Sequence, residues 1–440
     1  MGGGAGLGGS PPGAVRDELF SLRRLAPAPD SGLVVTRGGG WELEVDAHAR
    51  GGAPSPSRRP RSVVLRGRMG LHNVTAQREV FVVQCSAGPV RLVAQGPVNG
   101  LRVTARAVPR HDLADGYPSE GADRGDGDWP AYILQAGAST FADVEVHMEG
   151  SAEQLTVLQA ADLRLDYEAY GPHGLSSHSQ HVILPLAFPN NEAGASSGSW
   201  ESASSSSTSG LDDLVWPLKT HMLTHLDDPA DVVRAYLPQN YHPEPGDVLA
   251  VGESPLAAMQ GRWRPPAQVS PGLLARLACR LFAPTSSLAT ACGMQALVDA
   301  VGTWRVAAAV VLGVAARVLL RKRGVFYAVA GAQAALLDDL TGSLPPYDRH
   351  ISLGPLGAES AAADMRRALP PGVGVAIVDV NDLSRCTGHV RVLAASETVD
   401  VPALQQALLG NPAGNAAQQT PLVLVRPRRD REGAGRANGA

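Results

Sequence analysis

The chain carries two groups of acidic and amide side chains whose spacing could hold a divalent cation. One group follows an aliphatic stretch in AIVDVNDL, where Asp379, Asn381 and Asp382 come at the point where a buried strand would end. The other is the pair Asp338 and Asp339 in GAQAALLDDLTGSLPPYD. Hard oxygen ligands from two separate segments suit Mg²⁺ or Mn²⁺, which usually keep several waters and also bind substrate phosphates. The chemistry that they indicate is a metal ion holding a nucleotide.

Each acidic group also has a plain structural interpretation. Two acids at the end of a helix oppose its dipole, at a cost of about 0.3–1 kcal/mol each unless a cation neutralises them. If the helix ends earlier, Asp339 instead makes an Asx turn into Thr341 and Gly342. Acidic clusters at the starts of loops are also common in solvated turns, so the residues alone leave both interpretations open.

Two further segments could contact phosphate groups. APTSSLATACGMQ presents hydroxyls, Ser286 and Ser287 among them, near an expected helix start, where they would either bind an anion or cap the helix. NPAGN, which contains Asn411 and Gly414, is a small-residue loop whose backbone N–H groups could approach a phosphate. The same loop could equally be a plain connection between a helix and a strand.

His221 and His225 in KTHMLTHLDD have the i, i+4 spacing of a zinc-binding pair on a helix. Leu218, Thr220 and Met222 alternate with these histidines, however, so a strand explains the spacing at least as well. No glutamate lies between them as it does in HExxH. We therefore assign no metal to the pair.

These candidates lie in a chain of 440 residues, which is too long for one ordinary core. The sharpest boundary is the Ser-rich segment NNEAGASSGSWESASSSSTSG, which has almost no aliphatic residues and should be a flexible linker. Before it, segments such as SVVLRGRMGLHN and LRLDYEAYG alternate with period two between turn residues. They predict an antiparallel β-sandwich without a catalytic constellation.

After the linker, helical and strand patterns alternate. GDVLAVGES, GVGVAIVDV and TPLVLVRP read as buried strands, and DVPALQQALLG reads as a capped helix, which together predict an α/β or α+β domain. The expected organisation is a poorly ordered N-terminal region at 1–58, the β-sandwich at 59–189, the linker at 190–210, the α/β domain at 211–427 and a disordered tail at 428–440.

Composition limits the classes of partner and the cellular compartment. A net charge of −4 provides no general attraction to nucleic acid, so no nucleic-acid partner is expected. The four cysteines show no CxxC pairing, which argues against a zinc knuckle or a disulfide framework and favours a reducing compartment. The N-terminal segment lacks the apolar core of a secretory signal. We expect an intracellular protein of the cytoplasm or a plastid.

The segment WRVAAAVVLGVAARVLLRKRG is the most apolar helix candidate. Its uncharged run lies between Arg305 and Arg317 and falls short of the ~20 residues that cross a bilayer. We expect a core helix. The alternative is a helix at a membrane surface, with Trp304 and the Arg321, Lys322 and Arg323 cluster as anchors.

Several segments of the second domain resemble one family. PGDVLAVGESPLAAMQGRWRPP, LLDDLTGSLPPYDRHISLGP and GVAIVDVNDL resemble the gamma-glutamyl ligase of the deazaflavin coenzyme factor 420, over about Leu214–Pro427. The joint presence of GTWR, VDVNDL and NPAGN is similar to a cyanobacterial and chloroplast-lineage branch of that family.

The resemblance implies an amide ligation driven by GTP. GTP would phosphorylate a carboxylate of a small-molecule acceptor, and the amine of glutamate would then attack the acyl phosphate; such transfer depends on positioning and charge neutralisation. The metal-binding acids of the ligases match Asp338 or Asp339 and Asp379. The strand leading to Glu253 and Ser254 matches one that carries a nucleotide-side lysine in the ligases, and this sequence has no lysine there.

Two functions of different classes follow. The first is a metal-dependent ligase-like enzyme that joins glutamate to a carboxylate of a coenzyme-like acceptor, dimeric as the ligases are. The second is a non-catalytic scaffold that binds a nucleotide or a partner. One form of this hypothesis places the scaffold at a membrane surface. The sequence identifies no catalytic residue and does not choose between GTP and ATP.

Overall fold

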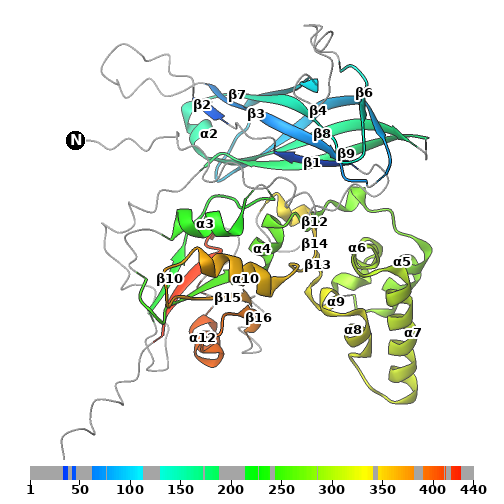
Figure 1. Ribbon diagram of the computed structural model, residues 1–440, viewed down its shortest axis with the longest axis vertical. Coiled ribbons are helices and arrows are strands. Elements are labelled where there is room, and N and C mark those ends of the chain that lie inside the picture. Colours follow the sequence, from blue (N-terminus) through cyan, green and yellow to red (C-terminus); the bar gives the residue numbers. More distant parts are fainter. Residues whose placement is uncertain are drawn as a thin grey trace, which may run out of the picture.

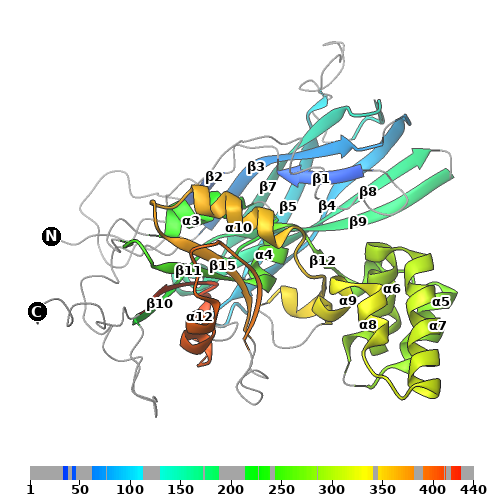
Figure 2. The same ribbon diagram turned by 60° about the horizontal axis from the view of Figure 1, so that its bottom comes forward.

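The computed structural model contains a β-sandwich, a mixed α/β layer beneath it and a helical unit that projects to one side (Figures 1 and 2). The residues that the structure describes are 33–37, 42–45, 62–75, 77–111, 129–171, 174–187, 214–225, 227–237, 243–284, 286–339, 345–380, 390–410, 412 and 418–427. The linker at 190–210 and the tail at 428–440 lie outside the described residues.

The N-terminal part is the antiparallel β-sandwich that the alternating segments predict. One sheet has the order β1-β3-β7-β5 with β2 also on β3, and the other has the order β6-β4-β8-β9. Its strands are β1 (Leu33–Arg37), β2 (Glu42–Val45), β3 (Ser62–Asn73), β4 (Val80–Ala94), β5 (Arg102–Pro109), β6 (Tyr132–Leu134), β7 (Ser139–Glu149), β8 (Leu158–Gly171) and β9 (Gly174–Pro185), with helix α2 (Ala152–Thr156) before β8.

Period-two alternation explains how the two sheets pack. Leu163, Leu165 and Tyr167 on β8 are buried in the core between the sheets, whereas the intervening Arg164 and Asp166 face outward and bond each other. The sheet also begins earlier than we expect. β1 and β2 pair with β3 although they lie within 1–58, because their short alternating runs supply edge partners to a long central strand.

The C-terminal part is built on a mixed five-stranded sheet, as the alternation of helix and strand patterns predicts. Its order is β10-β17-β11-β15-β16, in which β11 and β15 are parallel and the other pairs are antiparallel. The strands are β10 (Leu214–Leu218), β11 (Val248–Gly252), β15 (Gly374–Asp379), β16 (Arg391–Ala395) and β17 (Leu422–Arg426).

Helices cover both faces of this sheet. On the face toward the sandwich lie α3 (Pro229–Tyr236), α4 (Glu253–Met259) and α10 (Ala358–Arg367), whose apolar residues share a core with the sheet (Figure 1). On the other face, α12 (Val401–Leu408) buries Leu404 and Leu408 against the strands. Asp400 caps α12, so the predicted helix is confirmed.

The projecting helical unit lies between α4 and α10 in the chain. It contains α5 (Leu273–Ala278), α6 (Ala291–Val301), α7 (Thr303–Leu319), α8 (Val325–Ala330) and α9 (Ala332–Leu336), with the short 3₁₀ turns η3 (Pro266–Gln268), η4 (Cys279–Leu281), η5 (Ser287–Ala289) and η6 (Tyr347–Arg349) nearby. A three-stranded sheet in the order β12 (Trp263–Arg264), β14 (Ile351–Ser352), β13 (Asp338–Asp339) joins this unit to the rest.

The expectation that α7 is a core helix is wrong for most of its surface. Val306, Ala309 and Ala316 pack into the helical unit, but the opposite face of the helix is exposed. Composition could not reveal this, because an apolar helix at the edge of a unit has the same sequence pattern as one at its centre. Among the described residues no single helix is long and apolar enough to cross a membrane, and the bent pair α6 and α7 passes that test by length and composition only.

The sandwich and the C-terminal part share a small apolar interface. Val93, Ala160 and Ile183 of the sandwich cluster with Met222 and Tyr347, among others, of the C-terminal part. The Tyr347 hydroxyl donates to the carbonyl of Leu223 over 2.7 Å, and burial raises its pKa well above the usual value. Tyr347 therefore stays neutral and holds this junction as a hydrogen-bond donor.

Candidate functional site

The turn from β11 into α4 forms one part of the candidate site. The buried residues of β11 run to Gly252, and α4 begins at Glu253. An added Cβ at Gly252 would lie 3.0 Å from Cδ of Pro255, so a side chain at this position would require the proline ring to move. The turn thus presents Glu253 and the exposed Ser254 directly at the end of the strand.

Asp379 occupies the corresponding place on the neighbouring strand. β11 and β15 are parallel, with Gly252 opposite Val378, so Glu253, the first residue of α4, follows the strand end that lies beside the end of β15 at Asp379. On its other side Asp379 pairs in register with Arg391 of β16. Two carboxylates and one guanidinium-bearing residue therefore lie in successive positions across the carboxyl edge of the parallel pair.

The start of β17 reaches the same edge. β17 runs antiparallel to β11, with Val251 opposite Leu422, and the N–H of Gly252 donates to the carbonyl of Pro421. β11 and β15 are the parallel pair of this sheet, and α/β sheets bind ligands outside the carboxyl ends of their parallel strands. The loops that join these strands leave and enter at this edge.

Four of the predicted residues lie in those joining loops. Asn381 and Asp382 follow β15, and Asn411 and Gly414 precede β17. All four lie outside the described residues, so their roles stay predictions. The structure does show that the described ends of both loops, Val380 and Thr420, are at the same edge as Glu253.

Asp338 and Asp339 belong to a different sheet. Helix α9 ends at Leu336, and the two acids form β13, paired antiparallel with β14. The interpretation that they terminate a helix is wrong, because the backbone is already extended at Leu337. Their side chains are outside the described part, as is the segment that would test an Asx turn. Among the side chains described, no three His, Cys, Asp or Glu residues form a group that could hold a metal. A shared cation site with Asp379 stays a prediction.

Ser286 and Ser287 lie in the helical unit and not at the sheet edge. The Ser286 side chain accepts from the N–H of Leu288 and begins η5, and the Ser287 carbonyl accepts from the Thr290 hydroxyl. Thr290 in turn caps α6 by accepting from the N–H of Gly293 over 3.0 Å. These contacts are those of helix caps, which is the alternative that the sequence left open.

The same turn predicts a reversed effect for a helix glycine. Gly293→Ala should lower the free energy of unfolding by about 1–3 kcal/mol, although alanine normally stabilises a helix relative to glycine. The added Cβ would lie 2.4 Å from the Ser287 carbonyl oxygen and 2.8 Å from Oγ1 of Thr290. Urea unfolding followed by circular dichroism measures the loss. Gly410→Ala, whose added Cβ meets nothing within 4 Å, is the matched control, and an equal effect in both variants contradicts the prediction.

His221 and His225 are on neither a helix nor a strand, which corrects the expected strand. His221 is buried, its Nδ1 lies 2.6 Å from the Tyr236 hydroxyl, and its Nε2 lies 3.0 Å from Oδ1 of Asp227. Burial lowers the pKa of His225 to about 4 and raises that of Tyr236 to about 12. Both ring nitrogens of His221 are used within the fold, so its role here is structural. Its partners lie 6 and 15 residues further along the chain, and no local pattern indicates them.

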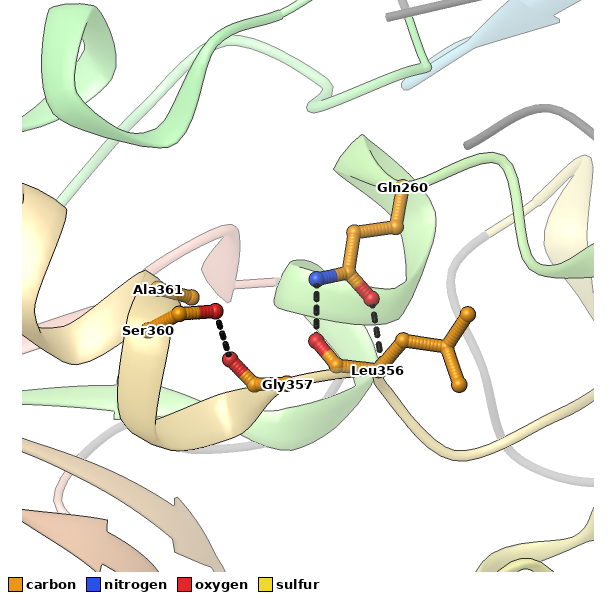
Figure 3. A pocket seen from close by; sticks show the side chains of 5 residues that line it. All are labelled: Gln260, Leu356, Gly357, Ser360 and Ala361. Atoms are coloured by element: carbon orange, nitrogen blue, oxygen red, sulfur yellow. Dashed lines mark hydrogen bonds between the residues drawn. The ribbon is translucent and has the colours of Figure 1, made fainter. Parts of the chain in front are cut away.

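A small pocket of about 140 Å³ lies at the other end of α4, lined by Gln260, Leu356, Gly357, Ser360 and Ala361 (Figure 3). The Gln260 amide donates to the Leu356 carbonyl over 2.8 Å and accepts from its N–H over 2.7 Å. Ser360 donates to the carbonyl of Gly357. These polar groups satisfy one another, and the volume is below the ~300–1,000 Å³ of ligand sites. The pocket is a junction between α4 and α10.

Comparisons with known proteins identify one part of the chain. Residues 53–188 match the family model described as "F420-0:gamma-glutamyl ligase, N-terminal Ig-like domain". No curated protein matches the chain.

Similar solved structures include a Northeast Structural Genomics Consortium target, which is 10% identical, with a TM-score of 0.20 over 37% of this chain and 90% of that one. The GAE domain of yeast GGA1 is 12% identical, with a TM-score of 0.16 over 35% and 91%. At such TM-scores these similarities say nothing about function. The family match spans the strands from β3 to β9, and the β-sandwich of this chain is similar to the N-terminal Ig-like domain of the factor 420-0:gamma-glutamyl ligases.

Proposed function

We propose that the chain is a metal- and nucleotide-dependent ligase that adds glutamate to a carboxylate of a deazaflavin-coenzyme-like acceptor. The observation that supports the proposal is that the parallel neighbours β11 and β15 end at the same edge of the sheet, one just before Glu253 and the other at Asp379. The Ig-like domain supports it, since the family is named for the N-terminal domain of such a ligase.

The donors present fit a hard divalent cation. Glu253 and Asp379 supply carboxylate oxygens, which are the ligands that Mg²⁺ and Mn²⁺ prefer, and Asp382 and the Asp338 and Asp339 pair are the further donors predicted from sequence. When bound, the cation would supply neutralisation of phosphate charge. Arg391, opposite Asp379 in register, would add a fixed positive charge beside the same phosphates.

The role of the chain's own residues is then to position the reacting groups. GTP would transfer its terminal phosphoryl group to the acceptor carboxylate, giving an acyl phosphate and GDP. The glutamate amine would attack the acyl carbon, the phosphate would leave, and the amine would lose a proton as the amide forms. Holding the reacting groups together accounts for much of the rate in such reactions, and the loops at this edge would enclose them.

The proposal is tested by titrating the full chain with GTP and with ATP by calorimetry, with and without Mg²⁺ or Mn²⁺. Asp379→Asn should weaken metal-dependent nucleotide binding by at least about tenfold, because it removes a charged ligand. Asp400→Asn is the matched control. Asp400 caps α12 beyond the opposite end of β16, and asparagine caps equally well. Indifference of the unmodified chain to both nucleotides would favour the non-catalytic scaffold instead.

A further inference from the structure

Helix α7 exposes a continuous apolar face that nothing in the described chain covers. Its exposed residues recur at helical spacing along the whole length of the helix, and Trp304 and Leu319 are 88% and 78% exposed. The face is formed by Trp304, Ala308, Val311, Leu312, Val318 and Leu319. An exposed helix face in a globular protein is normally charged or polar. The exposed charged residues within α7 are Arg305 and Arg317, and the helix carries no acid.

A second helix extends the apolar surface. Leu273 and Leu277 of α5 and Leu281 of η4 follow one another at four-residue intervals, and all three are exposed. α5 lies beside α7 at the outer side of the helical unit in both views, away from the sandwich and the five-stranded sheet (Figures 1 and 2). Exposed patches of this extent in otherwise well-packed proteins mark interaction sites.

The charge around this surface has one sign. Residues 266–336 contain seven Arg and Lys residues against a single acid, Asp299, within a chain whose net charge is −4. Asp299 is already paired with Arg264. Arg317, Lys322 and the other cations at the end of α7 are exposed. Arg321 adopts a left-handed backbone conformation, and the N–H of Lys322 donates to the Ala316 carbonyl, which holds these cations at the end of the helix.

We propose that this face, α7 with α5, docks on the surface of an anionic lipid membrane. An apolar face with cations along its border and an amphipathic tryptophan at one end is the composition of helices that lie in the headgroup region. A second copy of the chain fits less well. A symmetric dimer would place the same patch against itself, and would bring two strongly basic surfaces together.

The test is flotation of the full chain with vesicles of phosphatidylcholine alone and of phosphatidylcholine mixed with phosphatidylglycerol. The chain should float with the mixed vesicles, and raising the salt concentration should weaken binding because the charge attraction is screened. Fluorescence of Trp304 should be quenched by brominated acyl chains, and Trp304→Phe should remove that quenching. A chain that stays unbound to anionic vesicles overturns the proposal.

The apolar face is tested with Val311→Glu/Val318→Glu, which should reduce binding by at least about tenfold. Both side chains are exposed, so the fold should keep its thermal midpoint. The matched control is Ile133→Glu/Leu175→Glu, which adds the same charge at two exposed apolar positions of the sandwich. Equal losses in both variants overturn the proposal. So does sedimentation equilibrium that finds dimers dissociated by the α7 substitutions, since a second copy would then cover the face.

Discussion

Arg426→Met is expected to lower the free energy of unfolding of the C-terminal part by about 3 kcal/mol, because it strands a buried carboxylate. Asp247 is 1% exposed, and both of its carboxylate oxygens accept from the Arg426 guanidinium, Nε and Nη2 each over 2.9 Å. Asp247 also accepts from the N–H of Glu244 and orders the turn before β11. The hydrogen bond to Asp247 raises the pKa of Arg426, so the guanidinium stays charged.

A double-mutant cycle measures the interaction energy between Asp247 and Arg426 separately from the effect of each substitution alone. Asp247→Asn/Arg426→Met should cost less than the sum of the two single variants, with a coupling energy of about 2 kcal/mol. Arg426→Lys keeps the charge but loses the two-pronged geometry, and should recover only part of the loss. Urea unfolding followed by circular dichroism gives each value. Additive single losses would mean that the two side chains act independently, contrary to the geometry.

The position of this pair explains what such a variant should leave intact. Asp247 and Arg426 lie at the edge of the sheet opposite Glu253, at the other end of β11. The pair clamps the last strand of the chain to the central strand that carries the candidate site. Loss of stability with unchanged nucleotide affinity is therefore the expected signature of Arg426→Met.

Local sequence pattern predicted the helices and strands of this fold well where a clear periodicity or cap identified the element. The alternation in SVVLRGRMGLHN predicts β3, and the observed strand has the same bounds, Ser62–Asn73. Asp400 and the apolar spacing behind it predict α12. In such segments the buried face, the turn residues and the intrinsic propensity all indicate the same secondary structure, so tertiary contacts do not change it.

Side-chain partners were the part that pattern could not provide. The helix spacing of His221 and His225 is incidental, because His221 is fixed by Asp227 and Tyr236, which only the folded chain brings together. The common edge at which β11 and β15 end depends on a parallel pairing between strands more than a hundred residues apart, and strand register at that separation leaves no local trace.

His72→Gln is expected to flatten the acid side of the stability profile. His72 is 4% exposed in β3, its Nδ1 lies 2.5 Å from Oγ of Ser139 on β7, and burial lowers its pKa to about 4 from 6.5. The folded ring stays neutral while the unfolded ring binds a proton below about pH 6.5. Stability should therefore be complete above pH 6.5 and fall by up to about 3 kcal/mol as the pH drops to 4.

The pH range over which stability falls distinguishes the contribution of the His72 ring from that of the carboxylates. Hydrogen bonds from Arg66 first, and then Arg106 and His147, lower the pKa of Glu145 from 4.5 to about 2, so its contribution is lost only below pH 4.5. Urea unfolding of the wild type and of His72→Gln between pH 7 and pH 4 should differ in slope by up to ~1.4 kcal/mol per pH unit, the value for one proton. Nuclear magnetic resonance should find that the His72→Gln variant lacks one of the histidine signals that titrate near pH 4 in the wild type, whereas the signal of His225, whose pKa is also about 4, remains. Parallel profiles would show that the buried ring is already protonated at neutral pH, which burial of the ring makes unfavourable.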